Sequence, residues 1–463
     1  MTKTTKCTRR LVQKFVCIWA LVLSTHQVAS MDLRSKSEAR SHNRVLEANP
    51  TKMDNAKSSN HGAKSSKSAK SKSSGSGRGA IFAMTNASGG NEIIMYARKK
   101  NGRLRYTGSP FSTGGVGGDL VLQSPPDDPL ASQNSLVVAD NCLLAVNAGS
   151  NTLTSFEIRA EQGNNRGLHQ VSIVGSGGEI PVSIAYSSAN RFVYALNSGG
   201  PGSISGFTLN DECFLEPIPN SIVSLEQEPS DLLPFPDGPP YFISSPAQID
   251  FTPNSQQLLV TIKGIDGNPL SGGTINQFEV GDTGLVSNKR ITETGNDSIA
   301  PFSFDFDDDE NLLVVNAFGS STPGSANTGS VSMYNFQGLN NTVSLVQNEM
   351  IGQTAVCWIK YSNGCAFTTN NGSSSISSLS VSNSSITLID SVAASLNNPI
   401  DEIFSPNGRY LYALSTGHRS DGQPRIYVYD VINDCGLREI QVISDGLPTE
   451  FVTDFGAVGL AVF

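Results

Sequence analysis

Histidines and closely spaced cysteines, which build many metal and catalytic centres, are scarce in this sequence. Only five histidines occur in 463 residues, and the main body of the chain, residues 79–463, contains just His169 and His418. No two cysteines have the C-x-x-C spacing of a zinc site. We therefore expect no bound metal and no cofactor, and a His-based catalytic triad is disfavoured.

Long apolar runs are also missing. After residue 30, no stretch reaches the roughly 18 apolar residues that a membrane-spanning helix needs. Residues 1–30 combine basic residues, the short apolar run "FVCIWALVLS" and the small residues of "QVAS", a pattern typical of a secretory signal peptide. The alternative is a signal anchor that stays in place, although polar residues follow at once. We expect a secreted protein with no membrane span after cleavage near Ser30.

Charge is distributed unevenly along the chain. Residues 31–78 form a Lys/Ser-rich arm with eleven basic and four acidic residues, whereas residues 79–463 have 16 basic and 37 acidic residues. The arm contains too few large apolar residues to fold, so we expect disorder. Its composition resembles that of silica-associated secreted proteins, which implies binding to a polyanionic or mineral surface; the alternative is a plain linker. The acidic body argues against nucleic acid as the main partner.

Short strands separated by Gly, Ser, Asn and Pro recur from residue 79 onward, without helical periodicity. The first strand of a repeat reads "PVSIAYSSAN" at 181, "PAQIDFTPNS" at 246, "PFSFDFDDDE" at 301 and "PIDEIFSPNG" at 399, with looser copies at 133 and 354. Three further strands follow in each of six complete units. Repeats of roughly 45–70 residues with four strands each predict an all-β propeller.

A seventh unit is divided between the two ends of this body. The segment that starts at residue 79 has the second, third and fourth strand types, and the final "FGAVGLAVF" has the first. The sequence therefore predicts a seven-bladed β-propeller over residues 79–463, closed by pairing of the C-terminal strand with the N-terminal blade. The alternatives are a β-sandwich or two all-β domains, and a sandwich would not explain this match. We expect a monomer.

The repeats "PAQIDFTPNS…LLVT", "SPNGRYLYAL" and "NRFVYALNSGGPGSISGFTL" resemble those of the lactonase family of seven-bladed propellers, which includes 6-phosphogluconolactonases and 3-carboxymuconate cyclases. The resemblance covers residues 79–463 and implies that an Arg, a His and a Glu act on a lactone. Those positions hold Ala247, Gln248 and Lys263 here. A glutamine cannot act as a base near neutral pH, so the resemblance implies the fold without the family's catalytic set.

Residues at the strand ends near the channel mouth form the candidate site. Second strands repeatedly end in asparagine, which suits a ring of ligand-binding groups; the alternative is a role in the turns, because Asn tolerates left-handed backbone. The candidate ligand-binding residues are Asn147, Asn197, Asn316, Asn370, Gln248, Lys263 and Arg419. Asp401, Glu402 and His418 are the candidates for catalytic groups. We expect a small anionic or sugar-like ligand at the mouth.

Five cysteines remain after signal removal, and four of them occupy matching repeat positions. Cys142 and Cys365 each begin a second strand, and Cys213 and Cys435 each lie in a turn between third and fourth strands. Both pairs would join neighbouring blades in the same way, so we predict Cys142–Cys213 and Cys365–Cys435. Cys357 would then stay outside the disulfides, buried on an inner strand. The pairing requires a Cα separation below about 7 Å.

Five Asn-x-Ser/Thr triplets are consistent with a secreted glycoprotein. They lie at Asn86, Asn296, Asn340, Asn371 and Asn383. Together these features predict a lactonase-like propeller that acts as a noncatalytic or catalytically divergent extracellular binding protein. The alternative is a hydrolase that opens a sugar or carboxylate lactone with a rebuilt active site.

Overall fold

The computed structural model describes one compact unit within residues 74–463. The described ranges are 79–118, 128–159, 167–227, 245–264, 272–295, 298–317, 327–337, 342–382, 384–417, 420–449 and 457–463. The expected signal peptide and the basic arm, residues 1–30 and 31–78, lie outside them. No helix in the described ranges has the length and apolar character required to cross a membrane.

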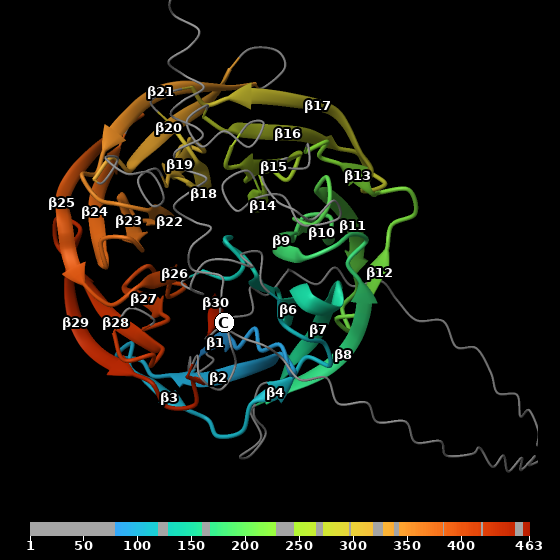
Figure 1. The fold of residues 1–463 in the computed structure, drawn as a ribbon, viewed down its shortest axis with the longest axis horizontal. Coiled ribbons are helices and arrows are strands. Elements are labelled where there is room, and N and C mark those ends of the chain that lie inside the picture. The colour runs from blue at the N-terminus through green and yellow to red at the C-terminus, as the bar shows by residue number, and fades with distance from the viewer. Residues whose placement is uncertain are drawn as a thin grey trace, which may run out of the picture. The chain divides into compact units, whose positions relative to one another are not determined.

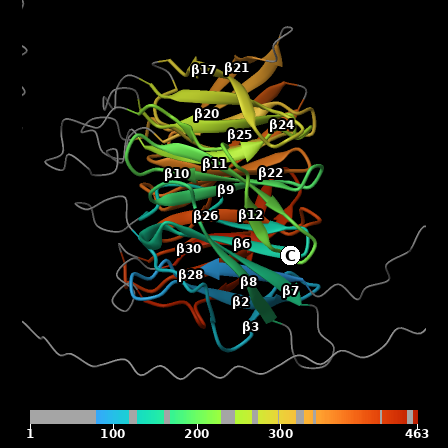
Figure 2. The same ribbon diagram turned by 90° about the vertical axis from the view of Figure 1, so that its right-hand side faces the viewer.

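The unit is a β-propeller of seven sheets arranged in a ring, which confirms the predicted fold class (Figure 1). Each sheet is one blade, and every pairing within a blade is antiparallel. Seen from the side, the blades that contain β2 and β17 lie at opposite ends of the ring (Figure 2). One short 3₁₀ helix, η1 (Ala148–Ser150), is the only helix among the described residues.

The inner strands of blades one to seven are β30 (Val458–Val462), β5 (Leu136–Ala139), β9 (Pro181–Ser187), β14 (Pro246–Phe251), β18 (Pro301–Phe306), β22 (Val356–Ser362) and β26 (Pro399–Phe404). The second strands are β1 (Ala80–Met84), β6 (Cys142–Asn147), β10 (Phe192–Asn197), β15 (Gln257–Ile262), β19 (Leu312–Asn316), β23 (Cys365–Asn370) and β27 (Tyr410–Ser415). The third strands are β2 (Glu92–Arg98), β7 (Thr152–Arg159), β11 (Ser203–Leu209), β16 (Thr274–Val280), β20 (Ser330–Gln337), β24 (Ser375–Ser382) and β28 (Arg425–Ile432). The outer strands are β3 (Leu104–Tyr106) with β4 (Phe111–Ser112), β8 (Gly167–Gly175), β12 (Leu215–Pro217) with β13 (Val223–Ser224), β17 (Val286–Glu293), β21 (Thr342–Met350), β25 (Ser385–Ser395) and β29 (Gly436–Ile443).

Blade one is completed by the two ends of this unit, as the sequence predicts. Strand β30 pairs with β1, with Ala461 opposite Phe82 and Val462 opposite Ile81. The pairing continues through hydrogen bonds of 2.8 and 2.9 Å between the backbones of Ala80 and Phe463. Because these bonds join two segments almost 400 residues apart in the chain, the ring has no open sheet edge at its closure.

Large apolar side chains fill the space between blades. The aromatic or leucine position at the centre of each third strand is buried throughout the ring, at Tyr96, Phe156, Phe207, Phe278, Tyr334, Leu379 and Tyr429. Second strands such as "CLLAVN" and "FVYALN" are buried along their whole length because both faces pack against neighbouring blades. This explains their continuous apolar sequence, which would be unusual in a half-exposed strand.

Four inner strands begin with proline, at Pro181, Pro246, Pro301 and Pro399. Proline suits the first position of a strand because it lacks the N–H that a ladder bond would use. In each case the pairing shifts by a β-bulge just after the proline. A bulge bends a strand and changes where its side chains point, and these strands line the central channel.

Two disulfides join neighbouring blades, as predicted. Cys142 binds Cys213 across blades two and three, and Cys365 binds Cys435 across blades six and seven. The Cα separation is 5.5 Å in both. Cys357 lies buried on β22 and is in neither disulfide.

Candidate functional site

The side chain of Gln248, at the position where the lactonases have histidine, joins two blades. It is fully buried on β14. Its Nε2 donates to the carbonyl of Phe304 on β18 at 3.0 Å, and its Oε1 accepts the Phe304 amide at 2.8 Å. Both ends of the side-chain amide are therefore occupied by backbone groups of the next blade. Ala247, at the arginine position, is likewise buried.

Lys263, at the glutamate position, follows β15 and is also buried. Its Nζ donates to the carbonyls of Ala131, at 2.8 Å, and Pro246, at 3.4 Å. The same nitrogen lies 5.0 Å from the centre of the Phe302 ring. Burial lowers the pKa of Lys263 to about 7, because the ammonium loses its hydration, and the Asp128 carboxylate offsets only part of this decrease.

Ala131, whose carbonyl Lys263 binds, belongs to residues 130–135, a segment that crosses the channel before β5 begins. We call it the channel segment. Trp358 Nε1 on β22 donates to the Ser132 carbonyl at 3.0 Å, and Ser132 Oγ donates to the carbonyl of Val182 on β9 at 2.8 Å. The Gln133 amide donates to the carbonyl of Ala247 at 3.2 Å. Blades three, four and six therefore all hold the channel segment.

These contacts lie where the inner strands begin, the end of the channel where we expected a ligand. The channel segment covers Ala247 and Lys263 there and uses their polar atoms. The repeat alignment places residues 133–135 in the inner strand of blade two, but β5 starts only at Leu136. Gln133 and Asn134 extend into the channel instead, whereas the Ser135 carbonyl still accepts the amide of Val146 on β6 at 3.1 Å. The Asn134 carbonyl accepts the amide of Ile184 on β9 at 2.8 Å.

The asparagines at the ends of second strands form hydrogen bonds within their own blades. Each donates through Nδ2 to two hydroxyl groups on the following strand: Asn147 to Thr152 and Thr154, Asn197 to Ser203 and Ser205, Asn316 to Ser330 and Ser332, and Asn370 to Ser375 and Ser377. All four asparagines are buried. The repeated pairing with hydroxyls accounts for the asparagines through the structure of the turn, without a ligand.

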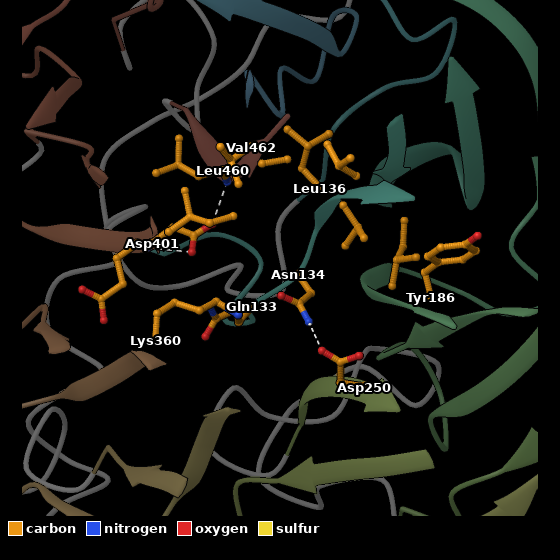
Figure 3. A pocket seen from close by; sticks show the side chains of 15 residues that line it. Gln133, Asn134, Leu136, Tyr186, Asp250, Lys360, Asp401, Leu460 and Val462 are labelled. Carbon is orange, nitrogen blue, oxygen red and sulfur yellow. Dashed lines mark hydrogen bonds between the residues drawn. The ribbon is translucent and has the colours of Figure 1, made fainter. Parts of the chain in front are cut away.

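A cavity of about 270 Å³ lies in the channel beside the channel segment (Figure 3). Gln133 and Asn134 line it, together with residues of β5, β9, β14, β22, β26 and β30. Leu136, Ile184 and Leu460 contribute apolar side chains to its wall. Asp250, Lys360, Asp401 and Glu402 supply charged groups. Of the predicted site residues that the structure describes, Asp401 and Glu402 alone line this cavity.

The carboxyl groups of this cavity have raised pKa values because the protein surrounds them. Burial raises the pKa of Asp401 to about 7, although the Leu460 amide, which donates to Oδ2 at 2.7 Å, and Lys360 lower it in part. Burial also raises the pKa of Asp250 to about 6, although part of its surface stays accessible through the channel. Asn134 Nδ2 donates to Asp250 Oδ2 at 3.0 Å.

Glu402 and Gln133 are the two described residues of the cavity wall whose buried side-chain polar atoms lack hydrogen bonds. Glu402 is fully buried, and neither carboxyl oxygen bonds to a described residue. Burial and the neighbouring Asp401 carboxyl raise the pKa of Glu402 well above 4.5. The nearby Thr369 amide offsets a small part of this increase, although it makes no hydrogen bond of normal geometry to Glu402. Gln133 is 2% exposed, and its Nε2 and Oε1 are both without a partner among described residues. Each such atom costs about 1–3 kcal/mol unless something occupies the cavity.

Some predicted site residues fall outside the described ranges. They are His418, Arg419, Asn296, Asn340 and Asn383. The other two candidate glycosylation sites are buried: Asn86 Nδ2 donates to the Gly118 carbonyl at 2.7 Å, and Asn371 Nδ2 to the Pro399 carbonyl at 3.3 Å. A glycan needs an exposed amide nitrogen, so this burial argues against modification of Asn86 and Asn371 in the folded protein.

Solved structures with the same architecture include propellers that are named as lactonases. A proposed 6-phosphogluconolactonase from Bacteroides fragilis superposes with a TM-score of 0.60 at 15% identity, over 84% of this chain and 99% of that one. The periplasmic gluconolactonase of Pseudomonas aeruginosa gives 0.56 at 14% identity, over 79% and 96%. This chain has the lactonase-like propeller fold. No family model and no curated protein matches the sequence.

Sequence reasoning missed three contributors to the cavity: Gln133, Asp250 and Lys360. A signal was present for two of them. Asp250, Asp305 and Lys360 occupy the same repeat position, since each pairs with the residue three before the end of its second strand. Charged side chains at one inner-strand position of three consecutive blades indicate a polar channel. Gln133 gave no comparable signal, because it was aligned within a strand.

Proposed function

We propose that this protein is a noncatalytic, ligand-binding propeller of an extracellular, oxidising compartment. The proposal depends mainly on the three positions that hold the Arg, His and Glu of the lactonases, because the side chains there are enclosed by the protein. Ala247 is buried, Gln248 is bound at both ends to the next blade, and Lys263 is bound to the channel segment. Without movement of that segment, a lactone has no access to these side chains.

Lys263 is the group that most favours the alternative, a lactone hydrolase. With a pKa of about 7, part of its population is neutral at pH 7, and a neutral amine is a competent base. Its nitrogen, however, is 2.8 Å from the Ala131 carbonyl and is enclosed by Phe302 and the channel segment. A base must reach the water molecule that it activates, and this nitrogen is fully engaged.

The first prediction is that the purified protein opens neither gluconolactone nor 6-phosphogluconolactone faster than buffer does. Hydrolysis is followed at pH 7 by titrating the acid released, with a known gluconolactonase as the positive control. Turnover that survives in Lys263→Met but disappears in Asp401→Asn would contradict the proposal. It would establish a rebuilt hydrolase site in the cavity, where Asp401 and Glu402 supply the carboxyl groups.

Two observations support the proposed location. Both disulfides join neighbouring blades, and such bonds persist in oxidising compartments. The leader-like composition of residues 1–30 agrees with export. For the ligand, the carboxyl groups of the cavity disfavour an anion, so we narrow the expected anionic or sugar-like ligand to a polar one without negative charge.

The second prediction concerns the basic arm, residues 31–78, as the attachment to a polyanionic or mineral surface. Deleting it should leave the melting temperature unchanged, because it contains no candidate core residues, and should reduce retention on silica or heparin. The loss should be larger in 20 mM than in 500 mM salt, because salt screens the attraction. Replacing the seven Lys residues of the arm by Ser, at constant length, separates charge from chain length. Equal retention of all three proteins would contradict surface binding.

A further inference from the structure

We propose that the channel cavity binds a small ammonium ion that also bears hydroxyl groups, such as an amino alcohol or amino sugar, with Gln133, Glu402, Asp401 and Asp250 as its ligands. This inference rests on the proposed binding function and specifies its ligand. It depends on two independent observations, the charge balance of the cavity and its buried polar atoms without partners.

The charge balance favours a cation. Lys360 on β22 interacts electrostatically with Asp250 on β14 and with Asp401 and Glu402 on β26, and all four residues line the cavity. Among the described residues, Lys360 is the one cation that acts on these three acids, and it makes no ion pair within 4.0 Å. When these groups are ionised, three carboxylates therefore face one ammonium. A second ammonium in the cavity would reduce the excess, whereas an anionic ligand would increase it.

Gln133 and Glu402 add a requirement that a bare cation does not meet. The Gln133 amide needs an acceptor for Nε2 and a donor for Oε1, and both atoms lack partners in the described structure. A hydroxyl group supplies both functions at once. Glu402 Oε1 and Oε2 also lack partners and need donors, which an ammonium group provides. The ligand must therefore bring several donors and at least one acceptor into the space between the two residues.

The cavity is large enough for such a molecule. Its volume of about 270 Å³ is far above the roughly 10–15 Å³ that a single water molecule requires. The apolar side chains in its wall, Leu136, Ile184 and Leu460, suit the carbon skeleton of the ligand. In Figure 3, Lys360, Gln133 and Asp401 lie on one side of the space and Asp250 and Tyr186 on the other, so a bound molecule would contact several blades.

The third prediction uses three probes that share a three-carbon skeleton and differ in charge: 3-amino-1,2-propanediol, glycerol and glycerate. Binding to the full chain is measured by calorimetry at pH 8. We expect the amine to bind at least tenfold more tightly than glycerol, and glycerate not to bind. We expect the affinity of the amine to fall at least tenfold at pH 5, where Asp250, Asp401 and Glu402 are protonated while the probe keeps its charge.

Matched variants locate the site. Glu402→Gln and Asp250→Asn remove one charge each from the cavity and should weaken amine binding about tenfold, whereas Asp309→Asn removes a charge from an exposed turn and should have no effect. Circular dichroism identifies any variant that fails to fold. If Glu402→Gln fails to fold, Asp250→Asn provides the test, because Asp250 is partly exposed. Equal affinity for the three probes, or equal effects of Asp250→Asn and Asp309→Asn, would overturn the inference. Lactone turnover would overturn the noncatalytic proposal and leave this binding result unaffected.

Discussion

The free energy of unfolding of the full chain is expected to fall as the pH rises from 5 to 7. Asp401 is the main reason, because its pKa is raised from 3.8 to about 7 in the folded protein. Between these values the folded state holds a proton that the unfolded state has lost, so increasing pH removes stability. For Asp401 alone the loss from pH 5 to pH 7 is about 2 kcal/mol. Asp250 and Glu402 act in the same direction.

Lys263 has the opposite effect, but at higher pH. Its folded pKa of about 7 lies below the 10.5 of the unfolded chain, so stability should increase as the pH rises from 7 toward 10. The two effects together predict a minimum of stability just above neutral pH. The exposed Asp421, whose pKa is lowered by Arg425, affects stability only below about pH 4, because its unfolded pKa is 3.8.

The measurement is urea unfolding at pH 5, 6 and 7 with the disulfides intact. Asp401→Asn imitates the protonated carboxyl group and still offers an oxygen to the Leu460 amide, so it should remove about 2 kcal/mol from the pH dependence. Asp309→Asn, on an exposed turn, is the control and should leave the slope unchanged. A wild-type stability that stays level or rises between pH 5 and 7 would contradict the raised pKa of Asp401.

The fold was predictable because the propeller repeats its physical constraints from blade to blade. A buried second strand and a large apolar residue at the centre of the third strand recur throughout, and four of the inner strands start with proline. The divided blade followed from the same pattern, since "FGAVGLAVF" has the inner-strand type that the N-terminal blade lacks. Both disulfides were also predictable from repeat position, because the two pairs of cysteines occupy the same two repeat positions, each pair in two neighbouring blades.

The site was less predictable because it depends on residues that break the repeat. Gln133 belongs to a segment that leaves the strand pattern and crosses the channel, and no periodicity shows where such a segment goes. Lys263 was correctly placed near the channel, but its partner, the Ala131 carbonyl, lies 132 residues away in sequence. Asp401 and Glu402 were identified as well-placed carboxyl groups. Their closeness to Lys360 and Asp250 appears only when blades four, six and seven are in position.

Removing either disulfide is expected to cause the largest loss of stability of any small change in this protein. Cys142–Cys213 and Cys365–Cys435 span 71 and 70 residues, so each excludes a similar set of unfolded conformations. The loop-entropy estimate gives about 4 kcal/mol for each, and equal costs for the two. Because the bonds join different pairs of blades, the costs should add when both are removed.

The test compares two double variants, Cys142→Ser/Cys213→Ser and Cys365→Ser/Cys435→Ser, with the wild type by urea unfolding at pH 6. Cys357→Ala is the control, since it changes a buried cysteine on β22 and leaves both disulfides intact. Reducing the wild type with dithiothreitol should lower its stability to that of the variant lacking all four cysteines, about 8 kcal/mol below the oxidised protein. Unchanged stability in either double variant, or a disulfide-linked peptide that contains Cys357, would refute the pairing. If the loss is confirmed, the reduced ring would retain little of the 5–15 kcal/mol that usually holds a protein folded, and folding would depend on an oxidising compartment.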